Sequence, residues 1–169
     1  MKKCLPILAI LFLSPIISSS QDLLQSGPMV GYSTMLEALL WVQTTEAAEV
    51  HFEYFDQENP KERFQTESYT TEAKDGFVAK LIANKILPGK QYNYELFING
   101  KRITRDYPME FQSQILWQWR TDPPEVNFAI GSCNYVNEPR FDRPGKPYGG
   151  GYEIFTSIYE KDPDFIVWF

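Results

Sequence analysis

Closely spaced turn signals constrain the fold of this chain more than any other sequence feature. They are Asn59-Pro60, Asp75-Gly76, Pro88-Gly89 and Asn99-Gly100. Each of them separates short runs rich in the β-branched and aromatic residues that favour strands. Short strands about 8 to 12 residues apart, with no helical pattern between them, are typical of a β-sandwich. The first part of the chain is therefore predicted to be all-β.

The runs between the turns alternate as half-buried strands do. Val50, Phe52 and Tyr54 alternate with more polar neighbours, whereas the run 39–44 is mostly apolar on both faces. Asn99-Gly100 is the strongest hairpin signal in the chain. The predicted strands are 39–44, 50–55, 63–70, 77–83, 91–98, 101–103 and 114–120.

The N-terminus predicts an exported protein. Lys2 and Lys3 precede an apolar run, and small residues follow it up to Ser20, so we expect cleavage between Ser20 and Gln21. The apolar run is shorter than the roughly 20 residues that span a bilayer, and an uncleaved anchor is the alternative. We expect residues 1–20 to be a signal peptide, no transmembrane segment after its removal, and a secreted or periplasmic location.

Removing this signal changes the charge and cysteine counts. Without Lys2 and Lys3, the 16 basic residues become 14 against 22 acidic ones, a net charge of −8. Nucleic acids need clustered lysine and arginine, so we expect no nucleic-acid-binding surface. Without Cys4, the mature chain keeps one cysteine, Cys133.

The sequence pattern changes after residues 121–125, a Pro-containing segment that we expect to be a linker. The apolar run 126–130 leads into Gly131-Ser132-Cys133, and another apolar run, 165–169, is typical of a buried parallel strand. Between them lies helical spacing, set by Tyr152, Phe155, Ile158 and Tyr159. Strand, loop, helix and strand open an α/β domain. We expect a sandwich domain at 21–120 and, at 126–169, an incomplete α/β domain that is truncated at Phe169.

Residues 87–94, Leu-Pro-Gly-Lys-Gln-Tyr-Asn-Tyr, resemble the corner between strands E and F of fibronectin type III-like sandwiches. In such domains a tyrosine hydroxyl bonds to nearby backbone and holds the crossing between the sheets. The resemblance implies a fibronectin type III-like N-terminal domain. A fold does not give a function, so a secreted module that binds carbohydrate or protein is one hypothesis.

Cys133 follows the first predicted strand of the α/β segment, at the end where open α/β sheets bind ligands. An unpaired cysteine in an exported protein can be an intermolecular disulfide partner, a reactive thiol, a metal ligand or a small buried apolar residue. Cysteine–histidine catalysis lacks support, because the only histidine, His51, lies in the predicted sandwich. We assign His51 no role.

Two segments around Cys133 are distinctive. They are 128–135, Phe-Ala-Ile-Gly-Ser-Cys-Asn-Tyr, and 141–155, Phe-Asp-Arg-Pro-Gly-Lys-Pro-Tyr-Gly-Gly-Gly-Tyr-Glu-Ile-Phe. Both segments resemble the PhoD-like alkaline phosphatase family. The resemblance implies a metallophosphoesterase-like α/β domain with an iron and calcium centre that hydrolyses phosphate mono- and diesters. It also implies that Cys133 is an iron ligand, whose metal lowers the pKa of a bridging water.

Other polar groups lie near this segment. Asp142 and Arg143 are candidates for a phosphate-facing loop, and the glycines 149–151 either present N–H groups to an anion or give the loop room to turn. Asp162 and Asp164 flank the start of the last strand, the wrong end for the site, so we expect them to act in a helix stop and turn.

The resemblance implies the N-terminal portion of a secreted metal-dependent phosphoesterase that acts on a phosphoester substrate. The family's next ligand is an aspartate in a Gly-Asp pair directly after the second strand, and the sequence ends at Phe169 before that position. One thiolate does not make a metal site. We therefore expect this chain to be inactive alone and to bind no metal by itself.

Overall fold

The computed structural model describes residues 23–145 and 151–169, which divide into two compact units between Leu116 and Trp117. The predicted signal peptide, its cleavage point at Ser20 and Gln21, and the glycines at 149 and 150 lie outside the described residues. Each unit is described by itself below.

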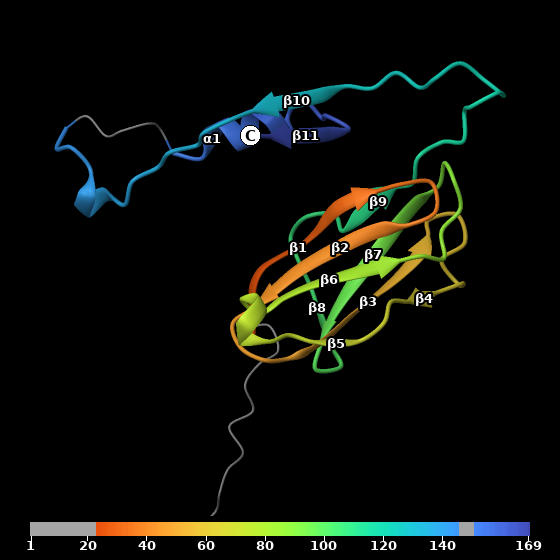
Figure 1. Ribbon diagram of the computed structural model, residues 1–169, viewed down its shortest axis with the longest axis horizontal. Coiled ribbons are helices and arrows are strands. Elements are labelled where there is room, and N and C mark those ends of the chain that lie inside the picture. The colour runs from red at the N-terminus through yellow and green to blue at the C-terminus, as the bar shows by residue number, and fades with distance from the viewer. Residues whose placement is uncertain (1–22, 146–150) are drawn as a thin grey trace, which may run out of the picture. The chain divides into compact units, whose positions relative to one another are not determined.

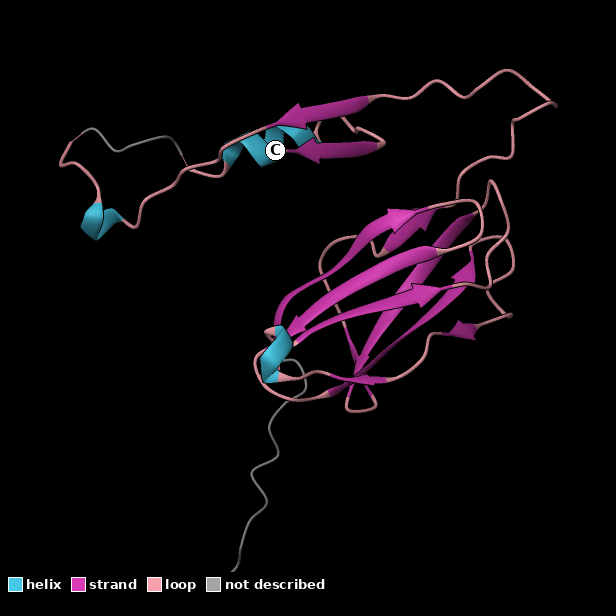
Figure 2. Ribbon diagram, in the orientation of Figure 1, coloured by secondary structure: helices cyan, strands magenta, loops and turns pink. Residues whose placement is uncertain are grey.

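The first unit consists of two antiparallel sheets (Figures 1 and 2), as the predicted β-sandwich requires. One sheet has the strand order β1-β2-β6, and the other has the order β4-β3-β7-β8, with β5 also paired to β3 and β9 to β7. A short 3₁₀ helix, η1 (Ala73–Asp75), precedes β6. The strands are β1 (Leu24–Ser33), β2 (Ala38–Thr44), β3 (Glu49–Asp56), β4 (Phe64–Gln65), β5 (Tyr69–Thr70), β6 (Val78–Ala83), β7 (Gln91–Ile98), β8 (Lys101–Ile103) and β9 (Glu110–Gln112).

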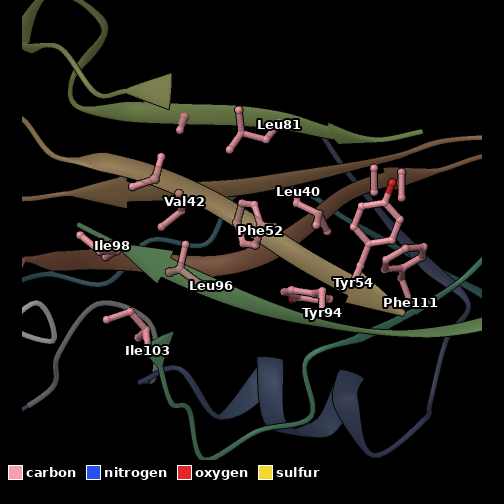
Figure 3. Close-up of a cluster of buried hydrophobic side chains, with 14 of the residues drawn as sticks. Leu40, Val42, Phe52, Tyr54, Leu81, Tyr94, Leu96, Ile98, Ile103 and Phe111 are labelled. Carbon is pink, nitrogen blue, oxygen red and sulfur yellow. The ribbon is translucent and has the colours of Figure 1, made fainter. Parts of the chain in front are cut away.

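The core of this unit lies between the two sheets and follows the period of two that its strands carry (Figure 3). In β2 and β3 every second residue is buried, and β7 does the same along its whole length. The outward residues between them are partly exposed. The largest fully buried side chains of the core include Leu40, Val42, Val50, Phe52, Tyr54, Leu96, Ile98 and Ile103.

The hairpin predicted at Asn99-Gly100 is confirmed. Both residues have positive φ, 49° and 72°, as a tight two-residue turn between antiparallel strands requires. Ile98 and Lys101 are paired across this turn. The Asn99 side chain also accepts the N–H of Glu49 at 2.9 Å, so the turn is tied to the start of β3.

Three parts of the predicted strand pattern are wrong. The run 63–70 contains only the two short strands β4 and β5, and the regions of β1 and β9 were not predicted as strands. Residues 114–120 form no strand. The N–H of Gln114 donates to the Thr34 carbonyl and the Gln114 carbonyl accepts the N–H of Gly89, and no described residue after it forms a further backbone hydrogen bond to the sandwich. Beyond it, Trp117 accepts the N–H groups of Arg120 and Thr121 in a turn.

The second unit contains β10 (Phe128–Gly131), the 3₁₀ helix η2 (Pro139–Phe141), α1 (Glu153–Tyr159) and β11 (Phe165–Trp168). The two strands pair in parallel, with Phe128 opposite Phe165 and Gly131 opposite Trp168. Strand, helix and parallel strand follow in the predicted order. Apolar side chains of both strands and of the helix are exposed, and they are Phe128, Ile130, Ile154, Phe155, Phe165, Ile166 and Trp168.

Within the described part of the chain, no helix combines the length and the apolar character that a membrane crossing requires.

Candidate functional site

Cys133 lies two residues beyond the carboxyl end of β10, where the sequence places it. Its thiol is exposed and forms no disulfide. Its backbone is in the left-handed region, with φ at 53°, which is uncommon for a residue with a side chain. The chain therefore turns sharply at Cys133 as it leaves the strand.

A hollow of about 490 Å³ surrounds this strand end. The end of β10, the first turns of α1 and the end of β11 form its wall, so all three elements of the β-α-β unit contribute to it. The residues that line it are Ala129, Ile130, Gly131, Ser132, Cys133, Asn134, Gly151, Glu153, Ile154, Ile158 and Trp168. This is the end of a parallel sheet where α/β proteins bind ligands.

Gly131 and Trp168 fix the shape of the hollow. The indole of Trp168 lies so close to Gly131 that a Cβ added there would be 2.2 Å from the ring atom Cζ3. Only glycine fits between the strand and this ring. The glycine before Ser132-Cys133 is therefore required by packing against β11.

Glu153 brings a carboxylate to the same hollow, and the sequence reasoning did not single it out. It is the first residue of α1 and follows Gly151 by two positions in the sequence. A Cβ on Gly151 would lie 2.8 Å from Glu153 Oε1 and 2.9 Å from Oε2, so this glycine leaves room for the carboxylate. An acidic residue that opens the helix after three glycines was the available signal.

The remaining candidates of the sequence analysis lie elsewhere. Asp142 and Arg143 follow η2, and Asp142 Oδ1 accepts the N–H of Arg143 at 2.8 Å. Neither side chain is among those that line the hollow. Their role toward phosphate stays a prediction.

Asp164 lies at the opposite end of the strand pair from Cys133. Its Oδ2 accepts the N–H of Asn127 at 2.7 Å, and its own N–H donates to the Asn127 carbonyl at 2.8 Å. These bonds join the amino ends of β10 and β11. Asp162 has a φ of 46° and donates its N–H to Tyr159, so it forms the turn after the helix.

His51 belongs to the first unit. Its ring stacks on Phe97, with centroids 4.9 Å apart and 4° between the planes. Its Nδ1 is buried and has no hydrogen-bond partner among the described residues. It is not among the residues that line the hollow around Cys133.

The donor set of this hollow does not fit a closed metal site. A thiol and a carboxylate line it, and among the described residues no group of three or more histidine, cysteine, aspartate or glutamate side chains could hold a metal ion. Stable coordination requires about four ligands from different elements. The predicted metal role of Cys133 therefore stays a prediction.

Comparison with solved structures shows which fold this chain resembles. A structure of PhoD is similar over 92% of this chain and 28% of its own length, with a TM-score of 0.62 and 16% sequence identity. The chain thus spans well under a third of that protein. The sensor domain of the anti-sigma factor RsgI4 from Pseudobacteroides cellulosolvens, in its long form, is similar over 55% of this chain and 90% of its own length, with a TM-score of 0.43 and 14% identity.

The similarity to PhoD covers both units. A sandwich followed by a β-α-β unit therefore occurs in a solved structure. No curated protein sequence matches the chain. One protein family does match, over residues 21–116, which is more than half of the chain and contains the whole β-sandwich. On this match, the protein belongs to the family described as Domain of unknown function (DUF7800).

Proposed function

We propose that this chain provides the sandwich and the opening β-α-β unit of a secreted metal-dependent phosphoesterase that hydrolyses phosphate mono- or diesters. The observation that carries the proposal is the position of Cys133, exposed at the carboxyl end of β10 in a hollow of about 490 Å³. The fold similarity to PhoD over 92% of the chain supports it. In this proposal Cys133 contributes one ligand to an iron and calcium centre.

The chemistry of the hollow supports one ligand and not a whole centre. A thiolate is a soft, charged ligand that suits iron, and the Glu153 carboxylate in the same hollow is a harder oxygen donor. A bound metal would activate a water for attack on phosphorus. The described residues lack the further ligands that this chemistry needs, so we derive no catalytic step for them.

The coding sequence downstream of the Phe169 codon is the first test. The proposal expects codons for Gly-Asp directly after β11, followed by further aspartate, asparagine and histidine codons. A stop codon at that point would contradict the proposal that these two units belong to a phosphoesterase.

Metal binding is the second test, and its readout does not depend on activity. The longest open frame is expressed and its iron content is measured, together with the thiolate-to-iron absorption band. Cys133→Ser should remove the band and most of the iron. Ser157→Ala, which changes an exposed hydroxyl bonded to the Glu153 carbonyl on α1, should keep both. An unchanged iron content and band in Cys133→Ser would exclude Cys133 as a ligand.

Activity of the 169-residue chain alone is the third test. With iron and calcium added, we expect it to hydrolyse neither p-nitrophenyl phosphate nor bis(p-nitrophenyl) phosphate, because its described residues hold no complete donor set. Turnover by this chain that Cys133→Ser does not affect would contradict the site proposed here.

A further inference from the structure

Strand β6 is the one long and regular edge of the sandwich. It borders the three-stranded sheet with β2 as its single neighbour (Figure 1). Its six residues pair with β2 in a continuous register, from Ala83 opposite Ala38 to Val78 opposite Gln43. It contains no proline and no bulge, two of the features that protect edge strands, and Lys80 is its charged residue.

The other edges of the sandwich are protected. β1 contains Gly27, Pro28 and Gly31, and its pairing with β2 has three register shifts. The edges of the second sheet are β4, β5, β8 and β9, each only two or three residues long. Short and irregular edges are poor templates for another strand. Among the described strands, β6 is therefore the edge best suited to accept one.

The backbone groups of β6 point alternately toward β2 and away from it. The N–H of Thr44 donates to the carbonyl of Phe77, directly before β6, so this pair is hydrogen-bonded. In an antiparallel ladder every second pair is bonded. Ala79, Leu81 and Ala83 thus bond to β2, whereas the N–H and C=O groups of Val78, Lys80 and Ile82 face the free edge. Within the described part of the chain no backbone group bonds to them there.

A cleft of about 450 Å³ lies along this edge. It is lined by Val78 and Lys80 of β6, by Tyr69 of β5 and by Asp75 of η1. The Tyr69 hydroxyl donates to Asp75 Oδ2 at 3.3 Å. When a peptide adds to a sheet as a strand, its backbone hydrogen bonds give affinity, and pockets for every second side chain give specificity. The cleft beside residues 78 and 80 is such a pocket.

The charge of Lys80 decides which strand fits. Its side chain is exposed, lies on the outer face of the sheet and has no ion pair among the described residues. If two copies paired through β6 so that outward side chains met outward side chains, Lys80 would lie opposite Val78, Lys80 or Ile82 of the other copy. None of these arrangements gives it an acidic partner, and like charges directly opposite are destabilising.

We propose that the free edge of β6 binds an extended peptide as an added strand, with an acidic side chain of the peptide opposite Lys80. Val78, Lys80 and Ile82 supply the backbone hydrogen bonds, and the cleft beside Tyr69 accommodates a peptide side chain. The site lies entirely in the sandwich, so it is independent of the role proposed for Cys133.

Amide hydrogen exchange of the full chain tests this directly. The probe is a synthetic peptide about seven residues long, of alternating valine and threonine with a central glutamate. When it binds, the amides of Val78, Lys80 and Ile82 should become protected, whereas those of Ala79 and Leu81 are already protected by β2. Lys80→Pro removes an N–H from the free edge only and should abolish binding.

Reversing the charges of the peptide and of residue 80 tests the role of Lys80 separately from any effect of Lys80→Pro on folding. The same peptide with a central lysine should bind the unmodified chain up to about fivefold more weakly. Lys80→Glu should reverse this preference. Equal affinity for both peptides in both variants would overturn the proposed acidic partner.

Two results would overturn the strand addition itself. One is no change in exchange at Val78, Lys80 and Ile82 at saturating concentrations of both peptides. The other is protection of these amides without peptide that grows with protein concentration and coincides with a dimer in sedimentation, which would identify a second copy as the occupant.

Discussion

The phenolic oxygen of Tyr92 accepts a hydrogen bond of 2.8 Å from the backbone N–H of Leu87, five residues earlier in the chain. Tyr92 is the second residue of β7, and its side chain is buried against Phe111, with stacked rings 5.3 Å apart. Because β6 belongs to one sheet and β7 to the other, this bond holds the corner where the chain crosses between them.

Tyr92→Phe should lower the free energy of unfolding by about 1 kcal/mol, because it removes the hydrogen bond and leaves the Leu87 N–H without this partner. Urea unfolding of the full chain measures the change. Tyr32→Phe is the matched control, since the Tyr32 hydroxyl donates to Glu37 at an exposed site and its loss should change stability by less than about 0.5 kcal/mol. Equal losses in the two variants would contradict a special role for the corner.

Arg63 contacts two glutamates that face each other across the sheet. Glu53 of β3 lies directly opposite Glu95 of β7, and like charges in this position repel. The Arg63 guanidinium contacts Glu53 at 3.0 Å and Glu95 at 2.5 Å, and it lies 4.3 Å from the centre of the Phe55 ring. Arg102 of β8 also contacts Glu95, at 3.0 Å, so two cations hold the pair, and Arg63 is the one that contacts both glutamates.

Arg63→Gln should lower the free energy of unfolding by about 0.5 to 1 kcal/mol at low salt, a small effect because the side chain is 37% exposed. The loss should shrink when salt is added, since salt screens the repulsion that remains. Adding Glu95→Gln should recover part of it. Arg140→Gln, which breaks a more exposed pair with Glu138, serves as the control and should change nothing measurable. A loss in Arg63→Gln that is independent of salt would indicate packing against Phe55 instead.

The sandwich should lose stability at alkaline pH, because its buried tyrosines lose their protons more readily in the unfolded chain. Burial raises the pKa of Tyr94, and Tyr107 adds a smaller effect. Burial also raises the pKa of Tyr54, although the N–H of Lys85 that donates to its hydroxyl oxygen opposes this. An unfolded tyrosine loses its proton near pH 10, so the stabilisation is complete below about pH 10 and is lost as the pH rises toward the folded pKa.

The free energy of unfolding should therefore fall between about pH 9 and about pH 11. Tyr94→Phe should lose less stability over this range, because it has one buried phenol fewer to ionise. Tyr159→Phe alters an exposed tyrosine of α1 and should follow the unmodified chain. Urea midpoints at the two pH values give the comparison. Identical pH slopes for all three proteins would show that Tyr94 does not contribute.

The sandwich was predictable where local chemistry decides the structure. Asn99-Gly100 specifies its own turn, and the residues around Tyr92 contain the corner signal. β1 was missed because Gly27, Pro28 and Gly31 remove the strand pattern, although pairing with β2 makes this segment extended. The run 114–120 has strand-forming residues but no strand beside it, and apolar character alone does not supply the missing hydrogen bonds.

The candidate site also has one part that the sequence predicts and another that it does not. The position of Cys133 follows from an apolar strand that ends at glycine, which the sequence displays. Glu153 and Trp168 reach the hollow only because β10 and β11 pair in parallel with α1 connecting them, and the sequence does not show which side chains then meet. Gly131 appeared to be part of a motif, whereas the structure gives it a packing role against Trp168.

This packing role leads to a test within the second unit. Gly131→Ala places a methyl group 2.2 Å from the Trp168 ring, and overpacking of this kind costs about 1 to 3 kcal/mol. The unit should then open more often, and limited proteolysis within 128–169 should accelerate by about fivefold to a hundredfold, since cleavage follows the population of the open form. The double variant Gly131→Ala, Trp168→Ala has no indole ring for the added methyl group to clash with. It should therefore be cleaved more slowly than expected if the effects of the two single variants were additive. Cleavage of the sandwich should be unaffected in all variants. Unchanged cleavage within 128–169 in Gly131→Ala would show that the ring does not pack on this glycine in solution.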